Sequence, residues 1–197
     1  MFIRRDLRKL KEWPAESREA AQLVIRKYGE PDEITDSQFI WHEPGPWKRI
    51  VASRQFYRHD FPIPHIDAVE SVIDYRVPIN RIAEVAEFDG SIVVERTAGE
   101  VSARCHGEEA NFLAINLMHD IVMGTKTSKQ AREYYVRELT DRHRGLPTPY
   151  MDTLRFMPTN NSADPDCRVI SDAELVGAIE DEAEERYVLN RVVRNGR

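Results

Sequence analysis

Two pairs of strand-like segments, each pair joined by a turn, constrain the fold of this chain most. Residues 37–43 and 47–57 are rich in aromatic and β-branched side chains, and the Pro-Gly-Pro between them is incompatible with a helix. Residues 91–97 and 100–105 have the same character around Ala98-Gly99. Strands that follow one another through short turns pair antiparallel, so both pairs are predicted to be β-hairpins.

The register of the second hairpin follows from its turn. If the loop is only Ala98-Gly99, Glu95 faces Ser102 and Val94 faces Ala103. One face is then apolar and the other carries Glu95, Ser102 and Arg104. A further strand is expected within 69–78, after a proline-punctuated loop at 59–67.

Helical patterns surround these strands. Residues 14–31 and 79–90 both end at glycine or proline signals, and the strongest helical pattern, 107–124, is apolar over most of its circumference. Thr127 and Gln130 form a capping box that opens the next helix. Residues 146–167 look loop-like, with a short strand at 151–157, before a capped amphipathic helix over 172–193.

This order predicts an α+β fold. We expect a two-layer domain in which a mainly antiparallel sheet of about five strands has helices packed on one face. Residues 1–150 would form this single domain. Residues 151–197, a loop plus the C-terminal amphipathic helix, are interpreted as an appendage.

Composition limits the function classes. With 28 basic and 34 acidic residues the net charge is −6, which argues against a nucleic-acid-binding surface. No apolar run has the length of a membrane span, and the N-terminal segment lacks the apolar core of a signal peptide. Two cysteines suit a reducing compartment, so we predict a cytoplasmic protein.

Common catalytic motifs are missing, including the P-loop, GxGxxG, GxSxG, HExxH and paired CxxC patterns. The segment RHDFPIPHID instead offers His59, His65 and Asp67, and His42 on the neighbouring hairpin would add a third imidazole. Imidazole and carboxylate together suit zinc, manganese or iron. The favoured interpretation is nevertheless local hydrogen bonding, because the prolines are expected to limit how His59 and His65 converge.

A second candidate is an anion or small-ligand site on the polar face of the 91–105 hairpin. Arg104 would act as a forked clamp and Glu95 as a base, with Ser102 between them, if that face lined a cleft. Lys48 beside Trp47 would add a second basic contact. The alternative, ordinary cross-strand pairing on a solvated face, is favoured. Trp41 and Trp47 are both expected in the core.

Two further polar residues, Cys105 and Asn111, are expected to have structural roles. Cys105 lies on the apolar face, and His119 is about three helical turns beyond it, so a Cys–His nucleophile is disfavoured and an inert buried thiol is expected. Asn111 falls within the apolar arc of its helix. It is expected to bond a loop carbonyl or the helix start, while a role in holding a strand edge or a ligand is the alternative.

The segments KYGEPDEIT, WHEPGPWKR and FDGSIVVERTAGEVSARC, followed by EEANFLAINLMHDIV, are similar to a group of uncharacterised bacterial soluble proteins. The resemblance covers roughly residues 20–140. It implies a bacterial cytoplasmic setting and transfers no activity, cofactor or catalytic residue.

The sequence therefore favours a non-enzymatic domain that binds a small molecule or a protein partner. The alternative is a metal-dependent hydrolase that uses the His/Asp loop cluster. The C-terminal helix is a candidate surface for a partner or a second copy of the chain.

Overall fold

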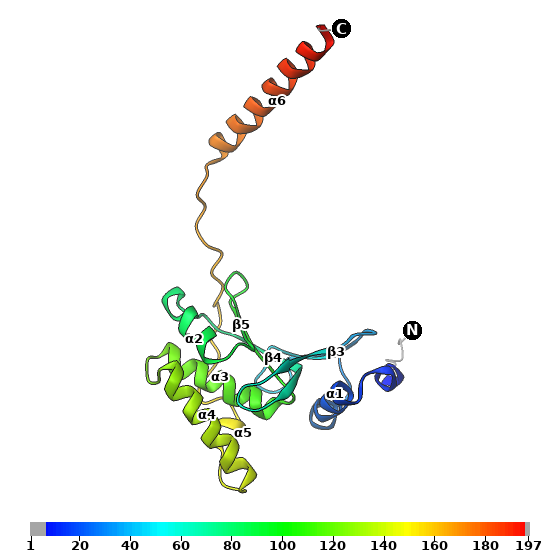
Figure 1. Ribbon diagram of the computed structural model, residues 1–197, viewed down its shortest axis with the longest axis vertical. Coiled ribbons are helices and arrows are strands. Elements are labelled where there is room, and N and C mark those ends of the chain that lie inside the picture. The colour runs from blue at the N-terminus through cyan, green and yellow to red at the C-terminus, as the bar shows by residue number, and fades with distance from the viewer. Residues whose placement is uncertain (1–6, 196–197) are drawn as a thin grey trace. The chain divides into compact units, whose positions relative to one another are not determined.

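The computed structural model describes residues 7–195 (Figure 1), and the chain divides into two compact units, up to Asp164 and from Pro165 onward. The first unit contains all the strands of the described residues. The second contains α6 (Asp172–Asn195), whose N-terminal capping box of Ser171 and Glu174 is formed as predicted. The sequence placed this boundary near residue 150, whereas the compact first unit continues to Asp164.

Within residues 7–195, six strands form one antiparallel sheet in the order β1-β2-β3-β4-β6-β5. Their bounds are Glu33–Ile34, Gln38–His42, Arg49–His59, His65–Asp74, Ile92–Glu95 and Glu100–Cys105 for β1 to β6. The α+β fold class is confirmed, with one strand more than expected. The extra strand is the short edge strand β1.

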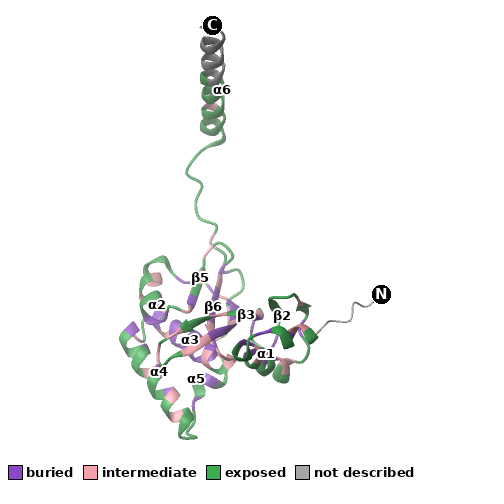
Figure 2. Ribbon diagram, turned by 45° about the vertical axis from the view of Figure 1, so that its right-hand side comes forward, coloured by how far each residue is buried: buried purple, intermediate pink, exposed green. Residues whose placement is uncertain are grey.

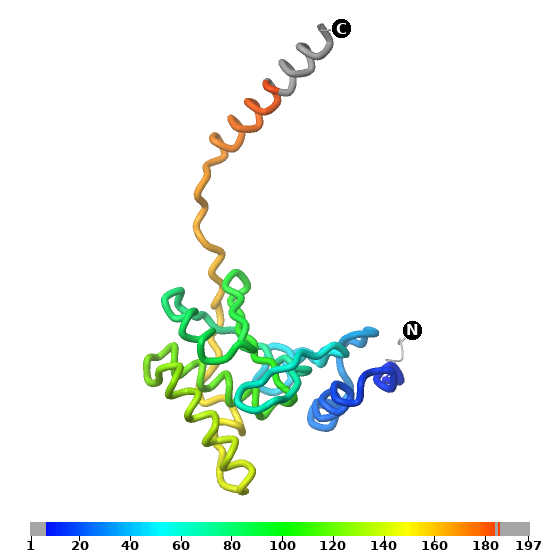
Figure 3. Tube along the Cα trace, in the orientation of Figure 1, coloured from blue at the N-terminus to red at the C-terminus, as the bar shows by residue number. Residues whose placement is uncertain are grey.

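The helices of the first unit are η1 (Leu7–Glu12), α1 (Ala15–Tyr28), η2 (Ile79–Arg81), α2 (Ile82–Phe88), α3 (Glu108–Val122), α4 (Ser128–His143) and α5 (Pro149–Asp152). Their path along the chain is traced in Figure 3. Local signals explain several boundaries: α1 ends at Gly29, whose φ of 81° favours glycine, and the predicted Thr127–Gln130 capping box opens α4.

Helices α1 and α3 cover the same face of the sheet. Ile50 of β3 pairs with Ser71 of β4, and Ser71 pairs with Ala103 of β6, so these three side chains share one face. All three are buried, α1 contacts β3 and β4, and α3 contacts β4 and β6. Figure 2 colours the ribbon by burial. The hydrophobic core therefore lies between this sheet face and the helices, as the alternation predicted.

Four local expectations need correction. The loop between β5 and β6 has four residues: Glu95 faces Glu100 and Val94 faces Val101, so the predicted register is wrong. The cause is a turn in which the Glu95 carboxylate accepts hydrogen bonds from the amides of Thr97 and Ala98, and Gly99 has a positive φ. The expected strand at 151–157 is also wrong, since α5 and an irregular segment lie there.

The other two corrections concern β4. The expected loop at 59–67 is mostly strand, because β3 runs to His59 and β4 begins at His65. Asn111 bonds neither a loop nor the helix start: its amide donates to the Val69 carbonyl at 3.1 Å and to Ser71 Oγ at 2.9 Å. The amide of Asn111 thereby ties α3 directly to β4.

Candidate functional site

The β3–β4 hairpin brings together the two histidines and the aspartate that the sequence singled out. His59 and His65 are directly opposite each other at the ends of β3 and β4, with ring centroids 5.0 Å apart. Asp67 follows two residues after His65 and so projects from the same face of β4. The five-residue connection at 60–64 closes the hairpin. The prolines therefore do not keep the histidines apart, contrary to the sequence-based expectation.

Asp67 is the least satisfied member of this cluster. Its side chain is only 5% exposed. Oδ2 accepts a hydrogen bond from the Ser91 hydroxyl, whereas Oδ1 accepts none from the described residues although it lies 3.2 Å from Nε2 of His65. Its charged neighbour is His65, at ion-pair distance, and a buried carboxylate oxygen without a hydrogen bond is rare in native proteins. The arrangement suits a cation placed beside Oδ1.

The second ring nitrogen of His65 is fixed by the backbone. Nδ1 lies 2.8 Å from the Ile63 carbonyl, which can only accept, so Nδ1 carries a hydrogen. Nε2 is then the nitrogen that faces Asp67, and this is the usual orientation of a metal-binding histidine. In the absence of an ion, Asp67, followed by Cys105, raises the pKa of His65 to about 11. A proton and a metal ion therefore compete for Nε2.

His59 sits between two carboxylates. Its Nδ1 is 3.1 Å from Ser91 Oγ and 3.6 Å from Oδ2 of Asp67, and its Nε2 is 3.7 Å from Oδ1 of Asp89. Burial raises the pKa of Asp89, while the backbone amide of Ser91 donates to that carboxylate. A carboxylate on the far ring nitrogen commonly orients a histidine ligand.

Helix α4 closes the cluster from the side. The buried phenol of Tyr135 interacts with the Cys105 thiol, and burial raises its pKa well above the usual range. Phe61, in the β3–β4 loop, packs on Tyr135, with 5.2 Å between the two ring centroids. The guanidinium carbon of Arg132 lies 3.8 Å from the centroid of the Phe61 ring. These contacts anchor the loop that positions His59 and His65.

The donor set fits a divalent transition-metal ion. One ligand atom from each of His59, His65 and Asp67 lies within 4.8 Å of the others. Two imidazoles and one carboxylate are ligands that zinc and non-haem iron share. The side chains of His59 and His65 are 19% and 18% exposed, so solvent reaches the cluster from the histidine side.

His42 lies elsewhere in the structure. It pairs with Arg49 at the start of β3, whereas His59 ends that strand, a separation of about 30 Å along the eleven residues. Its Nε2 is 2.6 Å from Glu33 at the edge of the sheet. The structure therefore does not bring His42 to the cluster.

The anion-site candidates are dispersed over the sheet face opposite α1 and α3. Lys48 pairs with Asp74 at 2.7 Å and Glu100 at 2.9 Å, and Glu95 is occupied in its own turn. Arg104 lies 3.5 Å from Glu70, which accepts a hydrogen bond from Ser102. Arg104 and Glu70 line a polar pocket of about 240 Å³ that Asp67 also borders.

Trp47 is buried, as expected, and takes part in a junction between three elements. Its ring stacks on Phe112, and its Nε1 donates to Glu108 at 2.6 Å. Glu108 also accepts a hydrogen bond from Tyr28 and pairs with Lys27 at 2.5 Å. These contacts join α1 and the segment before β3 to the first turn of α3.

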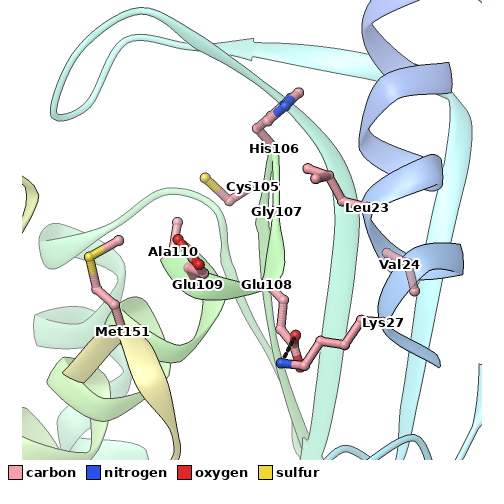
Figure 4. Close-up of a pocket in the computed structure, with 10 residues that line it drawn as sticks. All are labelled: Leu23, Val24, Lys27, Cys105, His106, Gly107, Glu108, Glu109, Ala110 and Met151. Atoms are coloured by element: carbon pink, nitrogen blue, oxygen red, sulfur yellow. Dashed lines mark hydrogen bonds and ion pairs between the residues drawn. The ribbon is translucent and has the colours of Figure 1, made fainter. Parts of the chain in front are cut away.

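A cavity of about 380 Å³ lies beside this junction, between α1 and the start of α3 (Figure 4). Leu23 and Val24 face it from α1, with Ala110 and Met151 among the residues across from them. Cys105 lines it at the end of β6. Because Cys105 also interacts with His65 and Tyr135, one side chain borders both the cavity and the His/Asp cluster.

Sequence reasoning missed four members of the cluster surroundings: Asp89, Ser91, Cys105 and Tyr135. They come from the end of α2, the start of β5, β6 and α4, and no short motif connects these positions. One signal was present for the histidines. A hairpin closed by the five residues 60–64 places residues 59 and 65 opposite each other.

No protein-family model, curated protein or solved structure matches this chain. Among the described residues, no helix combines the length and apolarity needed to cross a bilayer.

Proposed function

We propose that this protein binds one divalent transition-metal ion through His59, His65 and Asp67 and acts as a metal-dependent hydrolase. The observation that carries the proposal is the buried Oδ1 of Asp67, which lacks a hydrogen bond from the described residues and faces Nε2 of His65 at 3.2 Å. A positive ion there offsets the desolvation of the carboxylate.

The reaction class follows from the number of ligands. Three protein ligands are typical of catalytic zinc sites, where a fourth position is left for water, whereas structural sites use four. A divalent ion in such a site makes bound water acidic enough to attack at neutral pH. The partial exposure of His59 and His65 leaves a side open to solvent and substrate.

Neighbouring residues support the site without being ligands. Ser91 donates to Oδ2 of Asp67 and so fixes the carboxylate, and the Ile63 carbonyl fixes the ring of His65. Asp89 faces Nε2 of His59. Such outer contacts set ligand orientation, and their loss commonly lowers metal affinity ten- to a hundredfold.

Elemental analysis of the full chain tests the proposal. The protein is expressed in the cytoplasm of the host and purified without chelator. We expect about one zinc, manganese or iron per chain, and a sharp loss in Asp67→Asn, which keeps the side-chain shape but removes the charge. His42→Ala is the matched control and should retain the metal. Metal content that is absent from the wild type, or unchanged in Asp67→Asn, would overturn the proposal.

Hydrolysis is tested separately with p-nitrophenyl acetate and p-nitrophenyl phosphate. We expect turnover of one of these probes that disappears with chelator and returns with the metal found by elemental analysis. Metal binding without turnover of either probe would leave a metal-binding protein and refute the hydrolase assignment.

Non-enzymatic binding of a small ligand is the second candidate function. The cavity beside Cys105 favours it, since a cavity of this size is large enough for a small molecule. The two functions are compatible because the cavity and the metal ligands are different groups of residues.

A further inference from the structure

The cavity between α1 and the start of α3 has walls of two kinds. Apolar groups from three elements face it: Leu23 and Val24 of α1, Ala110 of α3 and Met151 of α5. Figure 4 shows the Lys27–Glu108 pair at one end and His106 at the other. The volume of about 380 Å³ is near the lower limit of small-molecule pockets and is too small for a helix, which is about 10 Å wide.

The charges at its wall are already neutralised. Lys27 pairs with Glu108, and Glu108 also accepts hydrogen bonds from Trp47 and Tyr28. Glu109 pairs with Arg142 of α4. A charged ligand would have to break one of these pairs or lose its hydration without compensation, which is unfavourable in an apolar site. A neutral ligand faces no such cost.

Two features connect the cavity with the exterior and with the protein interior. Leu23 is 38% exposed, so the α1 side of the cavity reaches solvent. Cys105 is buried and interacts with His65 and Tyr135. A molecule that enters beside Leu23 can therefore reach the buried Cys105 side chain, which lines the cavity.

We propose that this cavity is a binding site for a small neutral molecule with an alkyl or aryl body, which lies against Leu23, Val24, Ala110 and Met151 and reaches Cys105. The inference rests on the second candidate function and names its ligand class; it does not depend on metal binding, since none of the metal ligands lines the cavity. Burial of the apolar body supplies the affinity.

Fluorescence of N-phenyl-1-naphthylamine, a neutral apolar probe, tests the site in the full chain. We expect saturable binding at one site and at least tenfold weaker binding in Ala110→Phe, which fills the cavity. Ala15→Phe, the same substitution at an exposed position of α1, is the control and should bind like the wild type. Leu23→Gln, at the partly exposed mouth, should also weaken binding and guards against a folding defect in Ala110→Phe.

Two separate measurements test the charge preference of the cavity and the position of Cys105. Anilinonaphthalene sulfonate, the anionic analogue, should bind at least tenfold more weakly than the neutral probe. In Cys167→Ser, where Cys105 is the remaining cysteine, modification by neutral propyl methanethiosulfonate should abolish probe binding.

Three results would overturn the proposal. The first is absence of saturable probe binding, or equal binding by Ala110→Phe and wild type. The second is equal or tighter binding of the anionic analogue. The third is a dimer, detected by light scattering, that dissociates in Ala110→Phe, because the occupant would then be a second copy of the chain.

Discussion

Oδ1 of Asp67 lies 3.2 Å from Nε2 of His65, two residues earlier on the same strand, and accepts no hydrogen bond from the residues that the structure describes. His59 is placed opposite His65 by strand pairing alone. Two imidazoles and a buried carboxylate thus converge because of the register of one hairpin. The proposed metal centre rests on that register.

Glu108 and Glu109 are expected to differ sharply although they are adjacent. The Glu108 side chain is 9% exposed and accepts hydrogen bonds from Trp47 and Tyr28. Glu108→Ala therefore leaves these donors without a hydrogen-bond partner. We expect it to lower the free energy of unfolding by about 3 kcal/mol. Glu109→Ala breaks a solvent-exposed pair with Arg142 and should cost less than about 1 kcal/mol. Urea titration distinguishes the two, and equal effects would contradict this account of the junction.

Removal of the Asn111 amide should also destabilise the fold. Asn111→Ala deletes two buried hydrogen bonds between α3 and β4 and is expected to cost about 1–3 kcal/mol. Asn160→Ala, at an exposed position, serves as the control for chemical denaturation. An Asn111→Ala protein as stable as the wild type would show that the amide does not hold α3 to the sheet.

Glu100 should make stability sensitive to acid. Hydrogen bonds from Arg49 at 2.8 and 2.5 Å are the largest cause that lowers the pKa of Glu100 to about 2. A lowered pKa in the folded state stabilises the protein above the unfolded pKa of about 4.5, and this contribution is lost as pH falls from about 4.5 to 2. Glu100→Gln should flatten the fall in unfolding free energy over that range. Glu133→Gln, an exposed control on α4, should leave the slope as in the wild type.

The segment from residue 165 onward is expected to mediate self-association and to contribute little to the stability of the first unit. Leu175, Val176 and Ile179 of α6 are exposed apolar side chains, and such stripes are typical of interaction surfaces. The buried core consists of residues between Leu10 and Met151. Light scattering should therefore give more chains per particle for the full chain than for residues 1–164. The urea midpoints of the transition that both proteins share should be equal. An equal number of chains per particle in the two proteins would refute self-association through α6.

Local signals made much of the fold predictable from the sequence. The Thr127–Gln130 capping box, the apolar helix at 108–122 and the alternation in β6 each depend on neighbours within a few residues. The register of the β5–β6 hairpin was missed because Glu95 caps its own loop, which a count of turn residues does not reveal. At 59–67 the prolines favour a loop, whereas β3 and β4 pair there through the short connection that contains them.

The candidate site was predictable in residue type but not in geometry. His59, His65 and Asp67 were recognisable as metal-ligand chemistry, whereas Asp89 and Tyr135 reach the cluster through tertiary packing of α2 and α4. Cys105 was expected to be buried and is buried. Its contacts with His65 and Tyr135 depend on how α4 packs beside the sheet, which local sequence does not encode.

Isothermal titration calorimetry of the chelator-treated full-length protein with Zn²⁺ tests the metal centre most directly. The account predicts a single saturable site with about one ion per chain, at least a hundredfold weaker in His65→Ala and unchanged in His42→Ala. Absence of saturable binding by the wild type, or binding of equal strength and stoichiometry in His65→Ala, would contradict it.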